Sequence, residues 1–166
     1  ALCGVCQDGD VCGAGTCYDA DEGNTCADAF YVSVSATEPH LSNHDNSYAT
    51  NTYQKAYGEC SDFSSGTGSE GEDQAFYLTF EDPGTYRITV TPLDSWYAAI
   101  YVIDGSCSDF ENDCVGSEDF GSQWTGATFD LEASAFDSVY VIVDGDTDND
   151  WVNENGPYTF EVEALP

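Results

Sequence analysis

Basic residues are almost absent from this chain. Lys55 and Arg87 are the only two, against 32 acidic residues, and the formal net charge over 166 residues is −30. A chain this negative repels phosphate backbones and anionic lipid surfaces, so we expect neither a nucleic acid partner nor insertion into a membrane. The same charge strains a compact domain through self-repulsion unless cations lie among the carboxylates.

Methionine, an N-glycosylation sequon and a long apolar run are also missing. The longest apolar runs, such as residues 139–143, are far shorter than the roughly 20 residues of a membrane-spanning helix. The chain opens on Ala1 rather than Met, as expected after a signal peptidase has cut behind small residues. Eight cysteines, an even number, suit an oxidising compartment. We therefore expect a secreted, extracellular protein.

Half of the cysteines lie at the N-terminus. Residues 1–25 contain too few large apolar side chains for a core, but they contain Cys3, Cys6, Cys12 and Cys17. Such a segment holds its shape through covalent links. Three pairings are open; we favour the alternating pairs Cys3–Cys12 and Cys6–Cys17, with a zinc site of four thiolates as the alternative. The chain is thus divided into a Cys-rich segment, 1–25, and a domain, 26–166.

The other cysteines are predicted to form two local or medium-range links. Cys107 and Cys114 enclose six residues, SDFEND, which read as a turn, so a disulfide is expected to join them. Cys26 and Cys60 are then left to pair, which would tie the start of the domain to the end of a long polar stretch, 35–72. A stretch of that length is either a functional loop or contains strands that the pattern does not reveal.

From Cys26 onward the hydrophobic pattern is that of β-strands. Large apolar residues alternate with polar ones in three windows, 76–80, 86–91 and 158–163. Further strand candidates are 29–34, 96–103, 125–133 and 137–143, with turn-rich stretches such as EDPGT and ENGP between strands. No window has a helical stripe. The sequence predicts an all-β fold, an antiparallel β-sandwich of the jelly-roll or Greek-key kind.

Acidic residues alternate in the run DGDTDND, directly after the apolar run VYVIV. Trp151 and Pro157 stand where an EF-hand loop opened by Asp146 needs its glycine and its closing glutamate, so an EF-hand is excluded. Hard oxygen ligands at this density still favour calcium. The expected calcium ligands are Asp144, Asp146, Asp148, Asp150 and Glu154; the alternative is a solvated acidic loop.

Other candidate sites are weaker. His40 and His44 in HLSNH have the i, i+4 spacing of a zinc pair on a helix, but the glutamate of HExxH is missing and Pro39 favours a loop. The tryptophans, Trp96, Trp124 and Trp151, either form a stacking platform for sugars or fill the sandwich. The sequence has no GxSxG nucleophile elbow and no phosphate-binding glycine loop, and we expect no enzymatic activity.

Six motifs in order give the chain a family resemblance: NTCADAF, GEDQAFYLTF, PGTYRITVTP, AAIYVIDGSCSDFENDC, SVYVIVDGDTDND and GPYTFEVE. Together they span roughly residues 24–163, and in this order they resemble the bacterial pre-peptidase C-terminal (PPC) domain. The resemblance implies a non-catalytic β-sandwich of a secreted or surface protein of bacteria, with calcium sites in some members. The Cys-rich leader, the polar stretch before Glu72 and the lack of an attached peptidase depart from that family.

These observations predict a structural or adhesive protein of the bacterial cell surface. Residues 1–25 cannot fold alone and need a surface to lie on, which makes a self-assembling surface or fibril subunit, stabilised by calcium and disulfides, the favoured interpretation. Its partners would then be other copies of itself. The alternative is an accessory module of a secreted bacterial enzyme that binds extracellular carbohydrate or protein.

Overall fold

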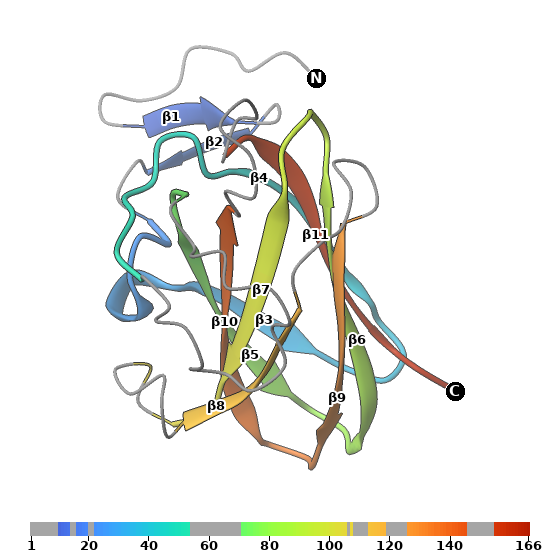
Figure 1. Ribbon diagram of the computed structural model, residues 1–166. Coiled ribbons are helices and arrows are strands. Elements are labelled where there is room, and N and C mark those ends of the chain that lie inside the picture. The colour runs from blue at the N-terminus through green and yellow to red at the C-terminus, as the bar shows by residue number, and fades with distance from the viewer. Residues whose placement is uncertain are drawn as a thin grey trace.

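The chain forms a sandwich of two β-sheets with a separate hairpin at one end (Figure 1). The computed structural model describes residues 10–13, 16–19, 22–53, 71–105, 107, 113–118, 126–145 and 155–166, the first two ranges as backbone only. Within these residues, no helix has the length and apolarity that crossing a membrane requires.

The strands fall into three sheets. The first sandwich sheet has the order β3 (Phe30–Val34), β5 (Gln74–Phe80), β10 (Ser138–Gly145), β7 (Ala98–Ile103), β8 (Cys114–Glu118). The second has the order β4 (His40–Asp45), β11 (Pro157–Ala164), β6 (Gly84–Pro92), β9 (Ala127–Ala133). The hairpin consists of β1 (Asp10–Gly13) and β2 (Thr16–Asp19), and a short 3-10 helix, η1 (Cys26–Asp28), leads into β3.

The predicted all-β sandwich is confirmed, with one parallel pairing in an otherwise antiparallel arrangement. β3 pairs parallel with β5, in the register Phe30 to Phe76. The reason is the strand between them: β4 lies in the polar stretch 35–72 and belongs to the opposite sheet, so the chain crosses the sandwich and returns in its original direction. The polar stretch 35–72 therefore contains a strand that its sequence pattern does not reveal, which is one of the two alternatives predicted for it.

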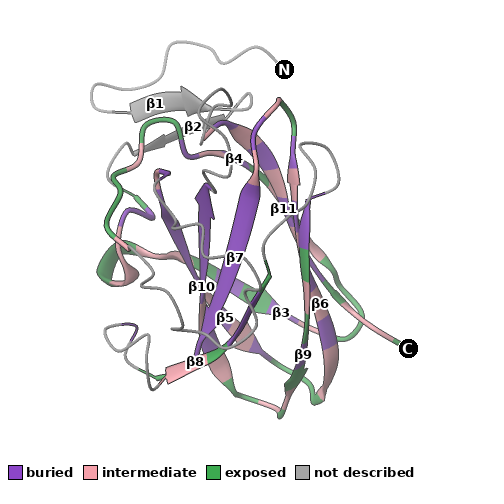
Figure 2. Ribbon diagram, viewed as in Figure 1, coloured by how far each residue is buried: buried purple, intermediate pink, exposed green. Residues whose placement is uncertain are grey.

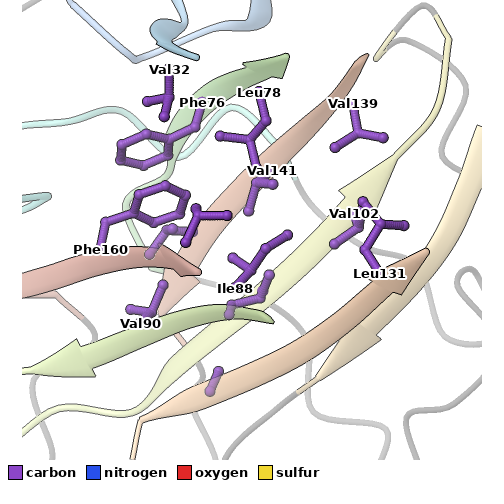
Figure 3. Close-up of a cluster of buried hydrophobic side chains, with 14 of the residues drawn as sticks. Val32, Phe76, Leu78, Ile88, Val90, Val102, Leu131, Val139, Val141 and Phe160 are labelled. Carbon is purple, nitrogen blue, oxygen red and sulfur yellow. The ribbon is translucent and has the colours of Figure 1, made fainter. Parts of the chain in front are cut away.

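The alternating windows bury the faces that the sequence predicted. Side chains from both sheets interdigitate between them (Figure 3), and the rings of Phe76 and Phe160 stack with centroids 3.9 Å apart and planes 7° from parallel. Burial of each large apolar side chain contributes about 1.5–3 kcal/mol. The middle strands β5, β7 and β10 are buried over most of their length, whereas β3 and β9 at the sheet edges alternate between buried and exposed residues (Figure 2).

A second apolar cluster covers the outer face of the five-stranded sheet. Ala75, Tyr101 and Ile142 belong to it, and Cys26 and Cys107 pack there from outside the sheet. These two cysteines form a disulfide, with Cα atoms 6.3 Å apart and a separation of 81 positions in sequence. The disulfide joins the entrance of β3 to the connection after β7, across the outer face.

This disulfide corrects two predicted pairs, Cys26–Cys60 and Cys107–Cys114. Cys107–Cys114 was predicted from closeness in sequence and Cys26–Cys60 by elimination, but the sheet order brings the segments before β3 and after β7 together over one face. Cys114 is disulfide-bonded to a residue other than Cys107.

The N-terminal pairs Cys3–Cys12 and Cys6–Cys17 lie outside the described side chains. The backbone of the hairpin sets Cys12 opposite Cys17, and β1 lies against β4 of the same chain (Figure 1). The division of the chain at residue 25 stays a prediction.

Replacing Cys26 and Cys107 together by serine should lower the free energy of unfolding. In the chain-entropy model, opening a loop of 81 residues costs about 4 kcal/mol. Denaturant unfolding of the double variant measures the loss, and mass spectrometry of the unreduced, proteolysed protein should recover a peptide linking Cys26 to Cys107. Recovery of a Cys107–Cys114 peptide in its place would contradict the assignment.

Candidate functional site

Buried polar side chains gather at one end of the sandwich, where β4 and β10 end and β5 and β11 begin. Four of them, Asn46, Asp73, Gln74 and Asp144, are at most 1% exposed. A buried polar group destabilises the fold unless it is hydrogen-bonded or charge-compensated. Each of these four side chains therefore needs a hydrogen-bond partner or a compensating charge. We refer to the four residues together as the polar end.

Asn46 and Gln74 are satisfied by contacts that join the two sheets. The Asn46 amide donates to the Glu72 carbonyl at 2.6 Å and accepts from the Gly156 amide at 2.8 Å. The Tyr158 hydroxyl of β11 donates to Gln74 Oε1 of β5 at 2.6 Å. These bonds cross-link the ends of strands that lie in different sheets.

Two further hydrogen bonds hold the residues on either side of the acidic segment 146–154. The amide of Gly71 donates to the carbonyl of Gly145 at 3.3 Å, and the side chain of Asn155 donates to the Glu72 carboxylate. Residues 145 and 155, which flank the acidic segment 146–154, are thus both held by the pair Gly71–Glu72.

Asp73 and Asp144 face each other across neighbouring strands. Val143 pairs with Gln74 in the antiparallel register of β10 and β5, and the next step of that register sets Asp144 opposite Asp73. Both are fully buried, and the Asp144 side chain lies close enough to affect the pKa of Asp73. By the two-residue period of a strand they lie on the same outer face as Ala75 and Ile142.

The environment of Asp73 disfavours its ionised form. Burial raises its pKa to about 7, although Oδ2 accepts hydrogen bonds from the amides of Tyr53 and Thr52 at 2.5 and 2.6 Å, which act in the opposite direction. Two carboxylates directly opposite each other on adjacent strands repel. The pair therefore has to share either a proton or a cation.

Asp144 is the one predicted calcium ligand that the structure describes. The sequence placed it in a loop, but it lies within β10, because the strand continues to Gly145. The other four, Asp146, Asp148, Asp150 and Glu154, lie outside the described residues. In the described part, no group of three acidic, histidine or cysteine side chains could hold a metal. A calcium ion at the pair would thus need ligands from elsewhere.

Sequence reasoning missed Asp73. Its signal is available only after β5 and β10 are paired, because Asp73 precedes one apolar strand and Asp144 ends another, 71 positions later by their numbering. Pairing the windows 74–80 and 138–145 side by side as antiparallel strands would have brought the two carboxyls together.

Trp96 does not belong to a sugar-stacking platform. It is fully buried in the main core, where its indole nitrogen donates to the Pro157 carbonyl at 3.2 Å. The filling role that the sequence left open is therefore correct for this residue. Trp124 and Trp151 lie outside the described residues.

The opposite end of the sandwich has an open cleft of about 430 Å³ beside the β9–β10 turn. Phe136 on its rim is 88% exposed and has φ +69°, a left-handed conformation that is uncommon for an aromatic residue. Its amide donates to the Phe80 carbonyl at 2.7 Å, which holds the turn in this form. Carboxylates of Asp104, Glu132 and Asp137 also line the cleft.

No protein-family model and no curated protein matches this chain. Among solved structures, it is similar to the pre-peptidase C-terminal domain of a collagenase from Bacillus anthracis, with a TM-score of 0.46, 9% identity, and coverage of 81% of this chain and 96% of that one. It is also similar to PliG of Aeromonas hydrophila, a periplasmic inhibitor of g-type lysozyme, with a TM-score of 0.42, 8% identity, and coverage of 82% and 99%. The sequence resembles the PPC domain family, and one of these two solved structures is a PPC domain.

With calcium removed by chelator, raising the pH from 6 to 8 should destabilise the protein through Asp73. Its folded pKa of about 7 lies above its ordinary value, so its contribution to stability is complete at low pH and is lost as the pH rises through 7. The loss over this interval is about 1 kcal/mol. Burial lowers the pKa of His44 to about 4, so the contribution of His44 to stability increases as the pH rises toward 6.5. The test therefore compares the pH dependence of the wild type with that of a variant.

Denaturant unfolding of Asp73→Asn at both pH values isolates the effect, because asparagine keeps an oxygen for the Thr52 and Tyr53 amides. The variant should lack the Asp73 contribution to the pH dependence. Glu38→Gln, which removes a carboxylate at an exposed position, should behave as the wild type. Identical pH dependence in wild type and Asp73→Asn would contradict the raised pKa.

Proposed function

We propose that this chain is a non-catalytic, secreted module with a structural or adhesive role outside the cell, stabilised by calcium and disulfides. The observation that carries the proposal is the buried pair Asp73–Asp144, which cannot keep two negative charges without a cation. The disulfide Cys26–Cys107 supports an oxidising compartment. Extracellular calcium would then be required for full rigidity of the polar end.

Calcium suits this position for two reasons. Its preferred ligands are carboxylate and carbonyl oxygens, and Asp144 begins a run in which Asp146, Asp148 and Asp150 follow at alternate positions. The residues on either side of the segment 146–154, Gly145 and Asn155, bond to Gly71 and Glu72, which directly precede Asp73 in sequence. An ion bound by Asp73, Asp144 and the acidic run would link β5, β10 and the segment before β11, and would offset part of the net charge.

Calcium should raise the melting temperature of the chelated protein. At about 10 mM, some tenfold above the roughly 1 mM dissociation constants of weak extracellular sites, binding adds about 1.4 kcal/mol, or about 3–5 °C for a domain of this size. Asp144→Asn and Asp73→Asn should each lose most of this increase. Thermal unfolding followed by circular dichroism measures it.

The matched control is Glu38→Gln, which removes one carboxylate from an exposed position and should keep the full increase. If Asp144→Asn responds to calcium as strongly as the wild type, the ion binds elsewhere among the acidic residues. If the wild type does not respond, the pair holds a proton only and calcium is no part of the stability of this protein.

Self-assembly is the finer part of the proposal. Among the strands that the structure describes, β3 and β8 are the edge strands of one sandwich sheet, and β4 and β9 are those of the other. The hairpin β1–β2 lies against the edge strand β4 of its own chain, and Leu41 on that strand is 65% exposed. The same contact made with β4 of the next copy would exchange the hairpin between chains and repeat from copy to copy.

Light scattering of the intact chain and of a chain lacking residues 1–25 tests this assembly. We expect the intact chain to associate in calcium, where the repulsion between highly charged copies is reduced, and the truncated chain to remain monomeric. Removing calcium should dissociate the intact chain. Two monomeric proteins at high concentration in calcium would show that the hairpin is only a cap on its own domain.

The cleft beside Phe136 favours a second candidate function, that of a binding module for extracellular carbohydrate or protein. An exposed aromatic ring in a strained conformation, beside carboxylates, suits stacking on a sugar together with hydrogen bonds to its hydroxyls, or contact with a cationic side chain. A ligand captured on a carbohydrate array or in a pull-down would favour this module over a purely structural role.

A further inference from the structure

The strand β4 presents three polar side chains on its inward face. His40, Ser42 and His44 occupy alternate positions, so they share one face, whereas Leu41 and Asn43 between them are exposed. The i, i+4 spacing is that of a zinc pair on a helix and Pro39 predicts a loop, but the structure has a strand here. In a strand, the same residues bring both imidazoles to one side with a hydroxyl between them.

The two imidazoles converge on a single oxygen. His40 Nε2 and His44 Nε2 each lie 2.8 Å from Ser42 Oγ. A hydroxyl has one proton, so it can donate to only one of the two rings and must accept from the other. The hydrogen bonds therefore require different proton positions on the two rings, although both nitrogens point to the same place.

Aromatic contacts orient the inner ring of this group. The centroid of His44 lies 4.6 Å from Phe30, 4.8 Å from Phe76 and 5.7 Å from Tyr158. His40 has one ring contact, with Phe160 at 6.2 Å, and is half-buried. Since β4 is an edge strand, the group lies at the side of the sandwich where the sheets end. The ring of His44 is thus packed more closely than the ring of His40.

Burial favours the uncharged form of both rings. Burial lowers the pKa of His44 to about 4, with a smaller effect of neighbouring His40, and burial also lowers the pKa of His40. Neutral imidazole is the form that coordinates metal ions, because a protonated nitrogen has no lone pair to offer.

We propose that His40, Ser42 and His44 form a binding site for a borderline divalent metal ion, Cu²⁺ or Zn²⁺, through the two Nε2 atoms. Imidazole suits these ions, whereas calcium takes oxygen ligands, so this site is chemically distinct from the Asp73–Asp144 pair. Bonds of about 2.0–2.1 Å require the two nitrogens to lie at most about 4.2 Å apart, so the ion would lie between the two rings and beside the Ser42 oxygen that both now contact. The Ser42 hydroxyl and water complete the coordination. The site is independent of the proposed structural function.

The test uses untagged, oxidised protein in millimolar calcium, which occupies carboxylate sites. His40 and His44 are the only histidines of the chain, so every imidazole signal reports on this site. NMR of the imidazole protons during titration with Zn²⁺ should show both rings shifting to saturation at one ion per chain. Electron paramagnetic resonance of the Cu²⁺ form should show coupling to two imidazole nitrogens, and Cu²⁺ should bind more tightly than Zn²⁺.

His40→Gln should weaken binding at least about tenfold, because it leaves one imidazole for the ion. Leu41→Gln is the matched control, since it changes the opposite face of the same strand and should bind as the wild type. Wild-type imidazole signals that do not move at a stoichiometric amount of either ion would overturn the proposal. Unchanged affinity in a folded His40→Gln variant would also overturn it, by placing the ion on carboxylates.

Discussion

The antiparallel register of β5 and β10 is the constraint on which the rest of this structure depends. It pairs Val141 with Phe76 and Val139 with Leu78 on the inner face, where the two sheets meet. On the outer face the same register brings Asp144 opposite Asp73. A shift of one residue would exchange the two faces. The register that packs the core is also the one that brings these carboxyls together.

The fold therefore buries two acids that cannot both be charged without compensation, which we propose a cation supplies. The core and the Cys26–Cys107 disulfide stabilise a chain that carries 30 net negative charges, and two of its acids are fully buried side by side. Hydrogen bonds from the Asn46 side chain and to Gln74 hold the strand ends rigidly around them. In our account, calcium makes this end of the sandwich stable in the extracellular medium and leaves the opposite end, with Phe136, free for contacts.

Local patterns in the sequence predicted the parts of the fold that alternate strictly between apolar and polar residues. β5, β6 and β11 were found in this way. β4 was not, because its inward face consists of histidine and serine and its outward face includes Leu41, which reverses the usual pattern. The parallel pairing of β3, the partner of Cys26 and the role of Asp73 each depend on which strands are neighbours, and no local window contains that information.

The most direct test of the central claim is the titration of the aspartate carboxyl carbons by ¹³C NMR, in chelator and then in calcium. Our account predicts one carboxyl signal with a midpoint near pH 7 in chelator, absent from Asp73→Asn. In calcium that midpoint should move to low pH, because the ion replaces the shared proton. If every carboxyl of the chelated protein titrates in the ordinary range of about 3–5, the buried pair holds no proton and the account is wrong.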